Sequence, residues 1–219
     1  MWADKILEFY QHLSITAKLP EGVVVLNPYR DPGAFEYCRQ FYSKFYTDNS
    51  PRTIIFGINP GRFGGGITGV PFTDPIKLEL CGIPNSLPRK PELSADFIYT
   101  MIGAFGGPEA FYRKYYFSAL SPLGFIREGK NLNYYDMREL QDALEPFMIQ
   151  CIRQQLAFGP SRDIAFCLGE GDNYRYLSQL NNRFEFFKTI VPLPHPRFIM
   201  QYRRKQLDEY VNRYISLLA

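Results

Sequence analysis

Four short runs of apolar residues stand out along the chain and predict buried β-strands. The runs span residues 53–58, 115–121, 163–168 and 186–193. Continuous apolarity over so few residues suits strands covered on both faces of a sheet. Two longer segments, 137–158 and 201–218, instead repeat their apolar residues at helical spacing. Strands that alternate with helices predict an α/β fold, a three-layer α/β/α sandwich around a central, mainly parallel four-stranded sheet.

The chain shows no sign of a division into parts. It has 219 residues, of which 46% are hydrophobic, enough for one substantial core, and no internal repeat or low-complexity linker interrupts it. We therefore expect one domain over residues 1–219. No apolar stretch approaches the roughly 20 residues that cross a bilayer, and the first residues do not resemble a signal peptide. These patterns predict a cytoplasmic protein with no membrane partner.

Charge and cysteine content narrow the possible chemistry. The formal net charge is only +3, so a site for a polyanion needs local clustering of basic residues. The four cysteines form no Cys-x-x-Cys pair, and we expect them to be reduced and mostly buried. With only two histidines beside them, the sequence predicts neither a metal site nor a cofactor.

A glycine-rich segment at residues 57–72 follows the first central strand, at the edge of an open α/β sheet where ligands bind. Three of its glycines fit Gly-x-Gly-x-x-Gly, but we expect the segment to continue as a loop into Val70-Pro71-Phe72 rather than open a helix. It also lacks the Gly-Lys-Ser/Thr of a nucleotide-triphosphate loop. Glycine lets backbone approach a flat ligand closely, so the segment predicts a planar-ligand site. Asn59 within it could equally hydrogen-bond its own turn.

The segment after the last predicted strand is the second candidate region. It reads Pro-His-Pro-Arg at 194–197, then an apolar tip, and then a basic stretch that we expect to start the last helix. A lone histidine is often a buried one bonded to backbone, but the position of His195 between two prolines after a strand favours a functional role. Two carboxylates, Asp74 before Pro75 and Asp172 after Gly171, are expected to cap helices.

These motifs resemble the single-strand-selective monofunctional family of the uracil-DNA glycosylase superfamily. Gly-Ile-Asn-Pro-Gly at 57–61 and Thr-Gly-Val-Pro-Phe at 68–72 match the family's first motif, and residues 194–197 lie where the family has His-Pro-Ser-Pro-Arg. The similarity extends over roughly residues 25–205. The resemblance implies a uracil-DNA glycosylase-like fold, DNA as the partner of a monomer, and hydrolysis of the bond between a flipped-out base and its sugar in base excision repair.

The resemblance also implies a role for each candidate residue. Asn59 would orient the attacking water, and His195 would donate a hydrogen bond to the departing base. Phe72 would stack on that base, while backbone around Ile58 and Gly61 meets its edges. The expected DNA contacts are Arg62, Arg197, Phe198, Tyr202, Arg203, Arg204 and Lys205. Neither motif contains a lysine that could form a Schiff base, so we expect no strand-cleaving lyase activity.

One departure from the family pattern concerns the choice of base. The family reads the edge of uracil with an asparagine, whereas this chain has Ala119 at the matching position and Ser118 beside it. Loss of that amide predicts relaxed discrimination, so xanthine and hypoxanthine join uracil as candidate substrates.

Two other interpretations remain open. The same fold could serve a non-catalytic protein that binds lesions or single-stranded DNA by stacking and charge. Alternatively, the glycine-rich loop could serve an α/β enzyme that acts on free nucleotides or nucleosides. A small-molecule enzyme would not need the basic, apolar-tipped segment at 197–205, and salt-sensitive binding to an oligonucleotide would favour DNA.

Overall fold

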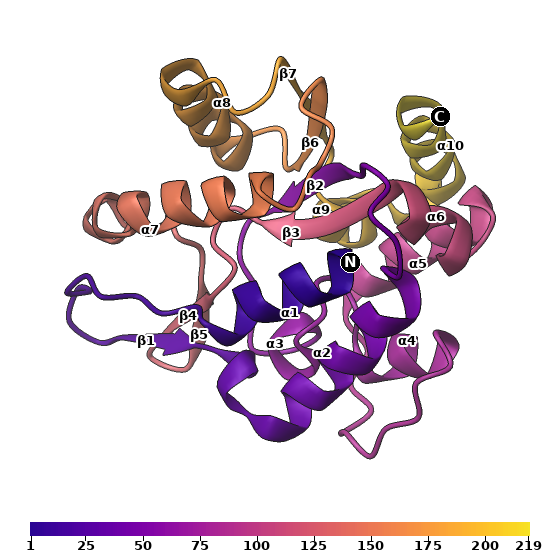
Figure 1. The fold of residues 1–219 in the computed structure, drawn as a ribbon, viewed down its shortest axis with the longest axis horizontal. Helices are drawn as coiled ribbons and strands as arrows, with labels where there is room; N and C mark the ends of the chain where they lie inside the picture. The colour runs from indigo at the N-terminus through magenta and orange to yellow at the C-terminus, as the bar shows by residue number, and fades with distance from the viewer.

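A four-stranded parallel sheet forms the centre of the molecule (Figure 1). The computed structural model describes residues 1–219. The strands, in spatial order, are β3 (Tyr115–Ala119), β2 (Thr53–Gly57), β6 (Ile164–Leu168) and β7 (Thr189–Leu193), and each neighbouring pair is parallel. All four strands fall within the runs predicted from the sequence, although β7 begins three residues later than its run and β3 ends two residues earlier. The predicted α/β class and parallel sheet are confirmed.

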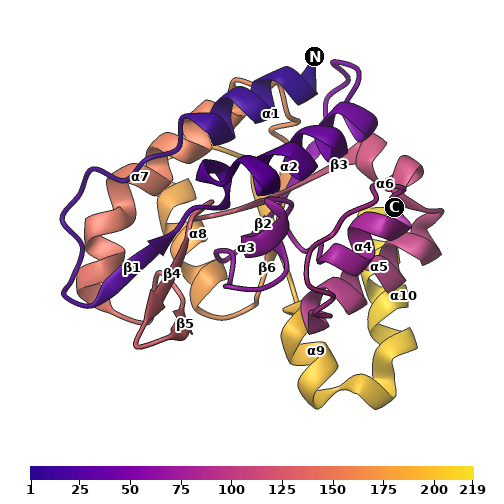
Figure 2. The same cartoon turned by 90° about the horizontal axis from the view of Figure 1, so that it is seen from below.

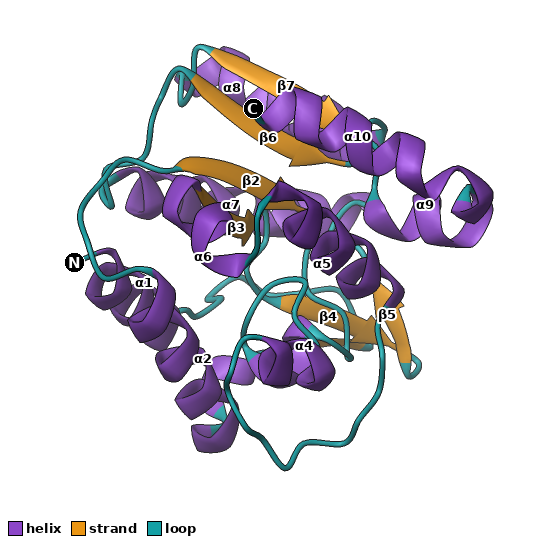
Figure 3. Ribbon diagram, turned by 90° about the vertical axis from the view of Figure 1, so that its right-hand side faces the viewer, coloured by secondary structure: helices purple, strands orange, loops and turns teal.

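Helices cover both faces of this sheet, which makes the three layers. Figure 2 separates the helices on one side of the sheet from those on the other, and Figure 3 shows the same division from a perpendicular direction. The first side has α7 (Arg138–Leu156) and α8 (Asp172–Phe184), and the second has α5 (Leu93–Phe105), α6 (Pro108–Lys114) and α10 (Leu207–Leu218). Two further helices, α1 (Trp2–Gln11) and α2 (Pro32–Phe45), lie beyond the β3 edge (Figure 3). A short 3-10 turn, η1 (Pro28–Arg30), leads into α2.

A second, antiparallel sheet was not predicted. It consists of β1 (Val23–Leu26), β4 (Gly124–Arg127) and β5 (Lys130–Leu132), in the order β1-β4-β5. Each strand has only three or four residues, of which one or two are exposed. β4 and β5 produce no apolar run, whereas β1 reads Val-Val-Val-Leu and is a short apolar run that was overlooked. The β4–β5 hairpin brings residues 131–135 to the carboxyl-terminal edge of the large sheet, where the cavity described below lies.

The predicted helix over residues 201–218 is wrong at its start. Helix α9 (Pro196–Tyr202) begins directly after β7, a 3-10 turn η2 (Arg204–Gln206) follows, and α10 begins only at Leu207. The basic residues 203–205 therefore lie between two helices instead of opening one. The acidic residues that favour a helix N-terminus, Asp208 and Glu209, come after them in the first turn of α10.

Two expectations about helix starts and the glycine-rich segment also need correction. The segment contains one helical turn, α3 (Gly65–Thr68), rather than loop throughout. Asp172 is the first residue of α8, whose N-cap is Gly171, so the side chain is not the cap. Asp74 does cap α4 (Pro75–Leu80), as predicted, because its Oδ1 accepts from the amide of Lys77 at 2.9 Å.

The core is rich in aromatic residues and contains the four cysteines. Tyr10 contacts the hydroxyl groups of Tyr42 and Tyr116 at 3.4 and 3.1 Å, which ties α1 to α2 and to β3. The cysteines, as expected, are buried and free of disulfides; they are Cys38, Cys81, Cys151 and Cys167. No helix combines the length and apolarity needed to cross a bilayer.

Candidate active site

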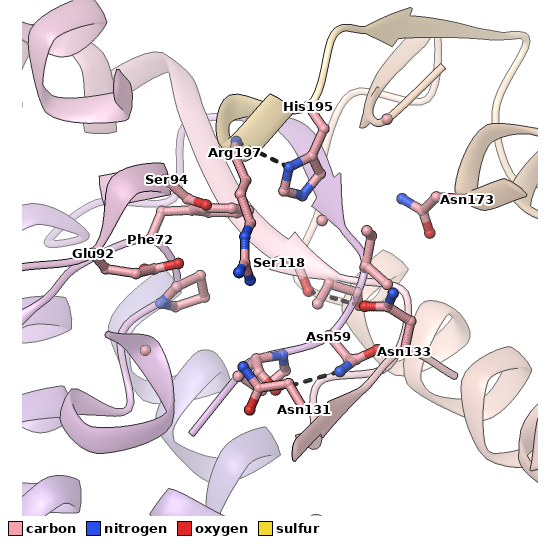
Figure 4. Close-up of a pocket in the computed structure, with 18 of the residues that line it drawn as sticks. Asn59, Phe72, Glu92, Ser94, Ser118, Asn131, Asn133, Asn173, His195 and Arg197 are labelled. Atoms are coloured by element: carbon pink, nitrogen blue, oxygen red, sulfur yellow. Dashed lines mark hydrogen bonds between the residues drawn. The ribbon is translucent and has the colours of Figure 1, made fainter. Parts of the chain in front are cut away.

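A cavity of about 590 Å³ opens at the carboxyl ends of the four parallel strands. Each strand contributes to its wall just where the strand ends, with Asn59 after β2, Ala119 at the end of β3, Gly169 after β6 and His195 after β7. Segments far apart in the sequence thus meet at one edge of the sheet, where open α/β folds bind ligands. Figure 4 shows this cavity, with His195 and Asn59 on opposite walls.

Asn59 is fixed by backbone on three sides. Its Nδ2 donates to the carbonyl oxygens of Pro60 (3.3 Å) and Leu132 (3.1 Å), and its Oδ1 accepts from the amide of Tyr134 (3.0 Å). Two of these bonds reach across to the segment after β5, so the amide does more than close its own turn. A carbonyl oxygen has two lone pairs, and Oδ1 keeps one for a water molecule in the cavity.

His195 is held as a neutral hydrogen-bond donor. Its Nδ1 caps α9 by accepting from the amide of Arg197 at 3.1 Å, which places the proton of the neutral ring on Nε2. Burial, and next the positive charge of Arg197, lower the pKa of His195 to about 4. At neutral pH the ring therefore carries no charge and has one N–H available to a ligand.

Phe72 supplies a flat surface on a strained backbone. Its φ of 55° lies in the left-handed region, which non-glycine residues rarely adopt. The ring lies 5.3 Å from that of Phe117, between centroids, and also lies against Gly57, where an added Cβ would be 2.8 Å from the ring. Gly57 thus leaves room for Phe72 to sit over the end of β2.

The backbone of the glycine-rich segment packs closely against other backbone. A Cβ on Gly66 would lie 1.9 Å from the carbonyl oxygen of Gly61, and one on Gly124 would lie 2.2 Å from that of Pro60. The Ile58 carbonyl accepts from the amide of Ser121 at 3.1 Å. These contacts fix the backbone on both sides of Asn59.

The residues expected to contact DNA divide into two groups. Arg197, Phe198 and Tyr202 project from α9 at the cavity, and Phe198 and Tyr202 are 41% and 67% exposed. The others lie outside the cavity: Arg62, Arg203, Arg204 and Lys205. Arg62 donates to the Gly129 carbonyl and stacks on Phe63, while Arg203 stacks on Phe198 with its Cζ 5.4 Å from the ring centre.

Comparison with known proteins decides the family. The family model of the uracil DNA glycosylase superfamily matches residues 43–219, most of the chain. The chain belongs to the uracil-DNA glycosylase superfamily. Among solved structures it is similar to wild-type SMUG2 of Pedobacter heparinus, with 46% identity and a TM-score of 0.96 over 99% of this chain and 96% of that one. No curated protein sequence matches.

In this glycosylase-family chain the β3 wall has no amide side chain. Ser118 is fully buried with its hydroxyl turned to the Ala119 carbonyl at 3.4 Å, and Ala119 presents only a methyl group. This side of the cavity therefore cannot offer the paired donor and acceptor of an asparagine to a base.

Several polar residues that line the glycosylase cavity were not predicted from the sequence. Asn131, Asn133 and Asn173 approach from the β5 hairpin and α8, and Glu92 and Ser94 approach from the start of α5 (Figure 4). None stands in a motif, and no pattern in their segments distinguishes them before the chain is folded. The Asn173 side chain has no group left for a ligand, because it already forms hydrogen bonds with Leu168, Cys167 and Tyr134.

Proposed function

We propose that this protein is a monofunctional DNA glycosylase that flips a deaminated base out of DNA and hydrolyses its bond to the sugar during base excision repair. Uracil is the first substrate, and the missing amide at Ala119 extends the range to xanthine and hypoxanthine. The observation that supports this most directly is the pairing, across one cavity, of a neutral His195 donor with a fixed Asn59 carbonyl.

The departing base develops negative charge on a carbonyl oxygen as its bond to the sugar breaks. The Nε2–H of His195 would donate to that oxygen, and a fixed donor in a largely dry cavity stabilises such charge better than water does. Because the pKa of His195 is about 4, the ring is neutral at pH 7. The one N–H of a neutral imidazole is a very weak acid, so the ring assists as a hydrogen-bond donor and does not give up its proton.

When the bond to the base is largely broken, the water molecule that attacks the sugar carbon has to be oriented more than it has to be deprotonated. The Asn59 amide cannot act as a general base at neutral pH, but its locked carbonyl would direct water at the sugar carbon once bond breaking is advanced. No lysine lines the cavity, which supports hydrolysis without a covalent enzyme–sugar intermediate. Phe72 would stack against the base, and α9 with its exposed Phe198 and Tyr202 would meet the DNA beside it.

The test is base release from short oligonucleotides that contain uracil, xanthine or hypoxanthine, single-stranded and paired, followed as abasic sites. We expect release by the wild type to fall at least about tenfold in Asn59→Ala and in His195→Ala, with thermal unfolding checked for both variants. If no base is released while the oligonucleotides still bind, the protein is a binding protein on a glycosylase fold and this proposal is wrong.

A further inference from the structure

Two oppositely charged side chains face the cavity without pairing. Glu92 lies at the start of α5 and Arg197 at the start of α9, and the Arg197 side chain extends into the cavity beside the Glu92 carboxyl group (Figure 4). No ion pair joins the two groups, although the Arg197 guanidinium lowers the pKa of the Glu92 carboxyl group. An acid and a base that share a cavity wall unpaired are available to a ligand.

The surroundings of Glu92 hold its carboxyl group in place. Its backbone amide donates to Oδ2 of Asp74 at 2.9 Å, which fixes the residue at the start of the helix. Its Oε2 lies against Gly64, where a Cβ would be only 2.3 Å away and where φ is +56°. The glycine-rich segment therefore leaves space for this carboxyl group on the cavity wall.

The electrostatic environment of Glu92 is unusual for a glutamate. Burial raises its pKa to about 7, and the nearby carboxylates of Asp74 and Asp96 add to the rise, while the Ser94 hydroxyl and the Arg197 guanidinium oppose it. A carboxyl group that is costly to ionise gains when a ligand donates a hydrogen bond to it.

The asparagine side chains around the cavity are engaged at one or both ends of their amides. Asn59 and Asn173 bond to the chain on both sides of their amides, and Asn133 bonds to Asp136. Asn131 accepts from the amide of Arg62. Of the charged side chains that line the cavity, Asp172 pairs with Arg175, whereas Glu92 and Arg197 make no ion pair.

We propose that Glu92 and Arg197 form a polar clamp for the far edge of the extruded base, and that deaminated purines depend on it most. Deaminated bases share a ring N–H beside a carbonyl group. A carboxylate accepts from that N–H, and a guanidinium donates to that carbonyl. The clamp would replace the amide that β3 lacks.

The position of the clamp explains the preference for purines. Figure 4 places Glu92 and Ser94 across the cavity from Asn59 and Asn133. A base whose sugar bond lies near Asn59 presents its far edge to that side. In a purine the N–H and carbonyl lie one ring farther from the sugar than in uracil, so they come closer to Glu92.

This inference rests on the proposed glycosylase function, and the test separates the two. Single-turnover release of hypoxanthine and uracil from otherwise identical single-stranded oligonucleotides is compared in the wild type, Glu92→Gln, Arg197→Gln and the double variant. Glu21→Gln, which changes an exposed glutamate in a loop, is the matched control. We expect Glu92→Gln to lower the ratio of hypoxanthine to uracil release about tenfold or more, the loss typical of one charged hydrogen bond.

The two single variants should also be coupled, so the double variant loses less than the product of their effects. An equal fall for both bases, an unchanged ratio, or a wild type that releases uracil but no hypoxanthine would overturn the clamp and leave the glycosylase proposal standing. A wild type that releases neither these bases nor xanthine, from single-stranded or paired oligonucleotides, would overturn both. If Glu92→Gln does not fold, as judged by thermal unfolding, the ratio in Arg197→Gln decides.

Discussion

His195 has two separate jobs on its two ring nitrogens. Nδ1 caps α9, and Nε2 is left with the proton that the proposed mechanism uses. The sequence predicted a functional histidine here from its place between two prolines and from the family resemblance. It could not predict the tautomer, because that depends on an amide that reaches Nδ1 only when α9 is folded.

The two jobs can be separated by substitution. Asparagine is a good N-cap, so His195→Asn should keep the capping bond and the fold while it loses the Nε2–H donor. We expect uracil release to fall about 10²- to 10³-fold with little change in thermal unfolding. Single-turnover kinetics and a melting curve on the same samples check this, and near-normal release would remove His195 from the mechanism.

The low pKa of His195 also predicts how stability depends on pH. The folded-state pKa of about 4 lies below the ordinary value of 6.5, so unfolding takes up a proton between these values. The contribution of the neutral His195 ring to the free energy of unfolding is fully present above about pH 6.5 and is lost as the pH falls toward 4. The free energy of unfolding of the wild type should therefore fall relative to that of His195→Asn over this window, in urea titrations at several pH values. Parallel curves would show that the ring is not buried as described.

Three polar residues of the cavity could not be predicted from the sequence: Glu92, Asn131 and Asn133. They are single polar residues in segments without repeat or motif, and only the folded chain brings them to the cavity. The motif residues were recognisable because several unusual residues stand together in a short stretch. Asn59 itself was ambiguous, since its decisive partners at Leu132 and Tyr134 are distant in sequence.

Among the elements, the glycine-rich segment shows why composition alone was informative but incomplete. Its glycines indicated that the backbone is closely approached by another group. In the structure that group is mostly the backbone of the same chain and not a ligand. Gly66 makes room for the Gly61 carbonyl, and the single turn of α3 is what brings the two together. That turn is too short to give a helical pattern in the sequence.

A pair of glycine substitutions tests this packing. Gly66→Ala would place a methyl group onto the Gly61 carbonyl, so the backbone beside Asn59 must shift, and we expect base release to fall at least about tenfold. Gly103→Ala in α5 meets nothing within 4 Å and should raise the free energy of unfolding by about 0.5–1 kcal/mol without affecting release. Equal behaviour of the two variants in kinetics and urea unfolding would contradict the packing described.

For the whole molecule, the sequence predicted the large sheet and missed the small one. The parallel strands β2, β3 and β6 are buried on both faces and so read as apolar runs. β4 and β5 are short and partly exposed, and the apolar run of β1 has only four residues. The break between α9 and α10 was also missed, because the polar residues 203–206 at this turn contain neither glycine nor proline to mark the end of a helix. The basic residues in that turn are consequently presented on a corner of the molecule.

The exposed basic residues at 203–205 predict how DNA binding responds to salt. With a net charge of only +3, the molecule as a whole attracts DNA weakly, and local cations must carry the phosphate contacts. Arg204→Gln and Lys205→Gln should each reduce the slope of log K against log salt by about 1. Lys188→Gln is the control, because Lys188 pairs with Asp163 at the opposite, amino-terminal end of the strands. Equal slopes in fluorescence-anisotropy titrations of all three variants would place the DNA elsewhere.

The four buried cysteines allow local unfolding to be measured in the unmodified protein. They lie in four different elements, Cys38 in α2, Cys81 at the end of α4, Cys151 in α7 and Cys167 in the central strand β6. Burial raises the pKa of every one of these thiols, to about 11 for Cys81 and about 12 for Cys167. A thiol reagent can reach each one only while its element is transiently detached from the core. The order of labelling under native conditions therefore ranks the cooperative units of the fold, from the helix beside the glycine-rich segment to the middle of the sheet, with no residue introduced.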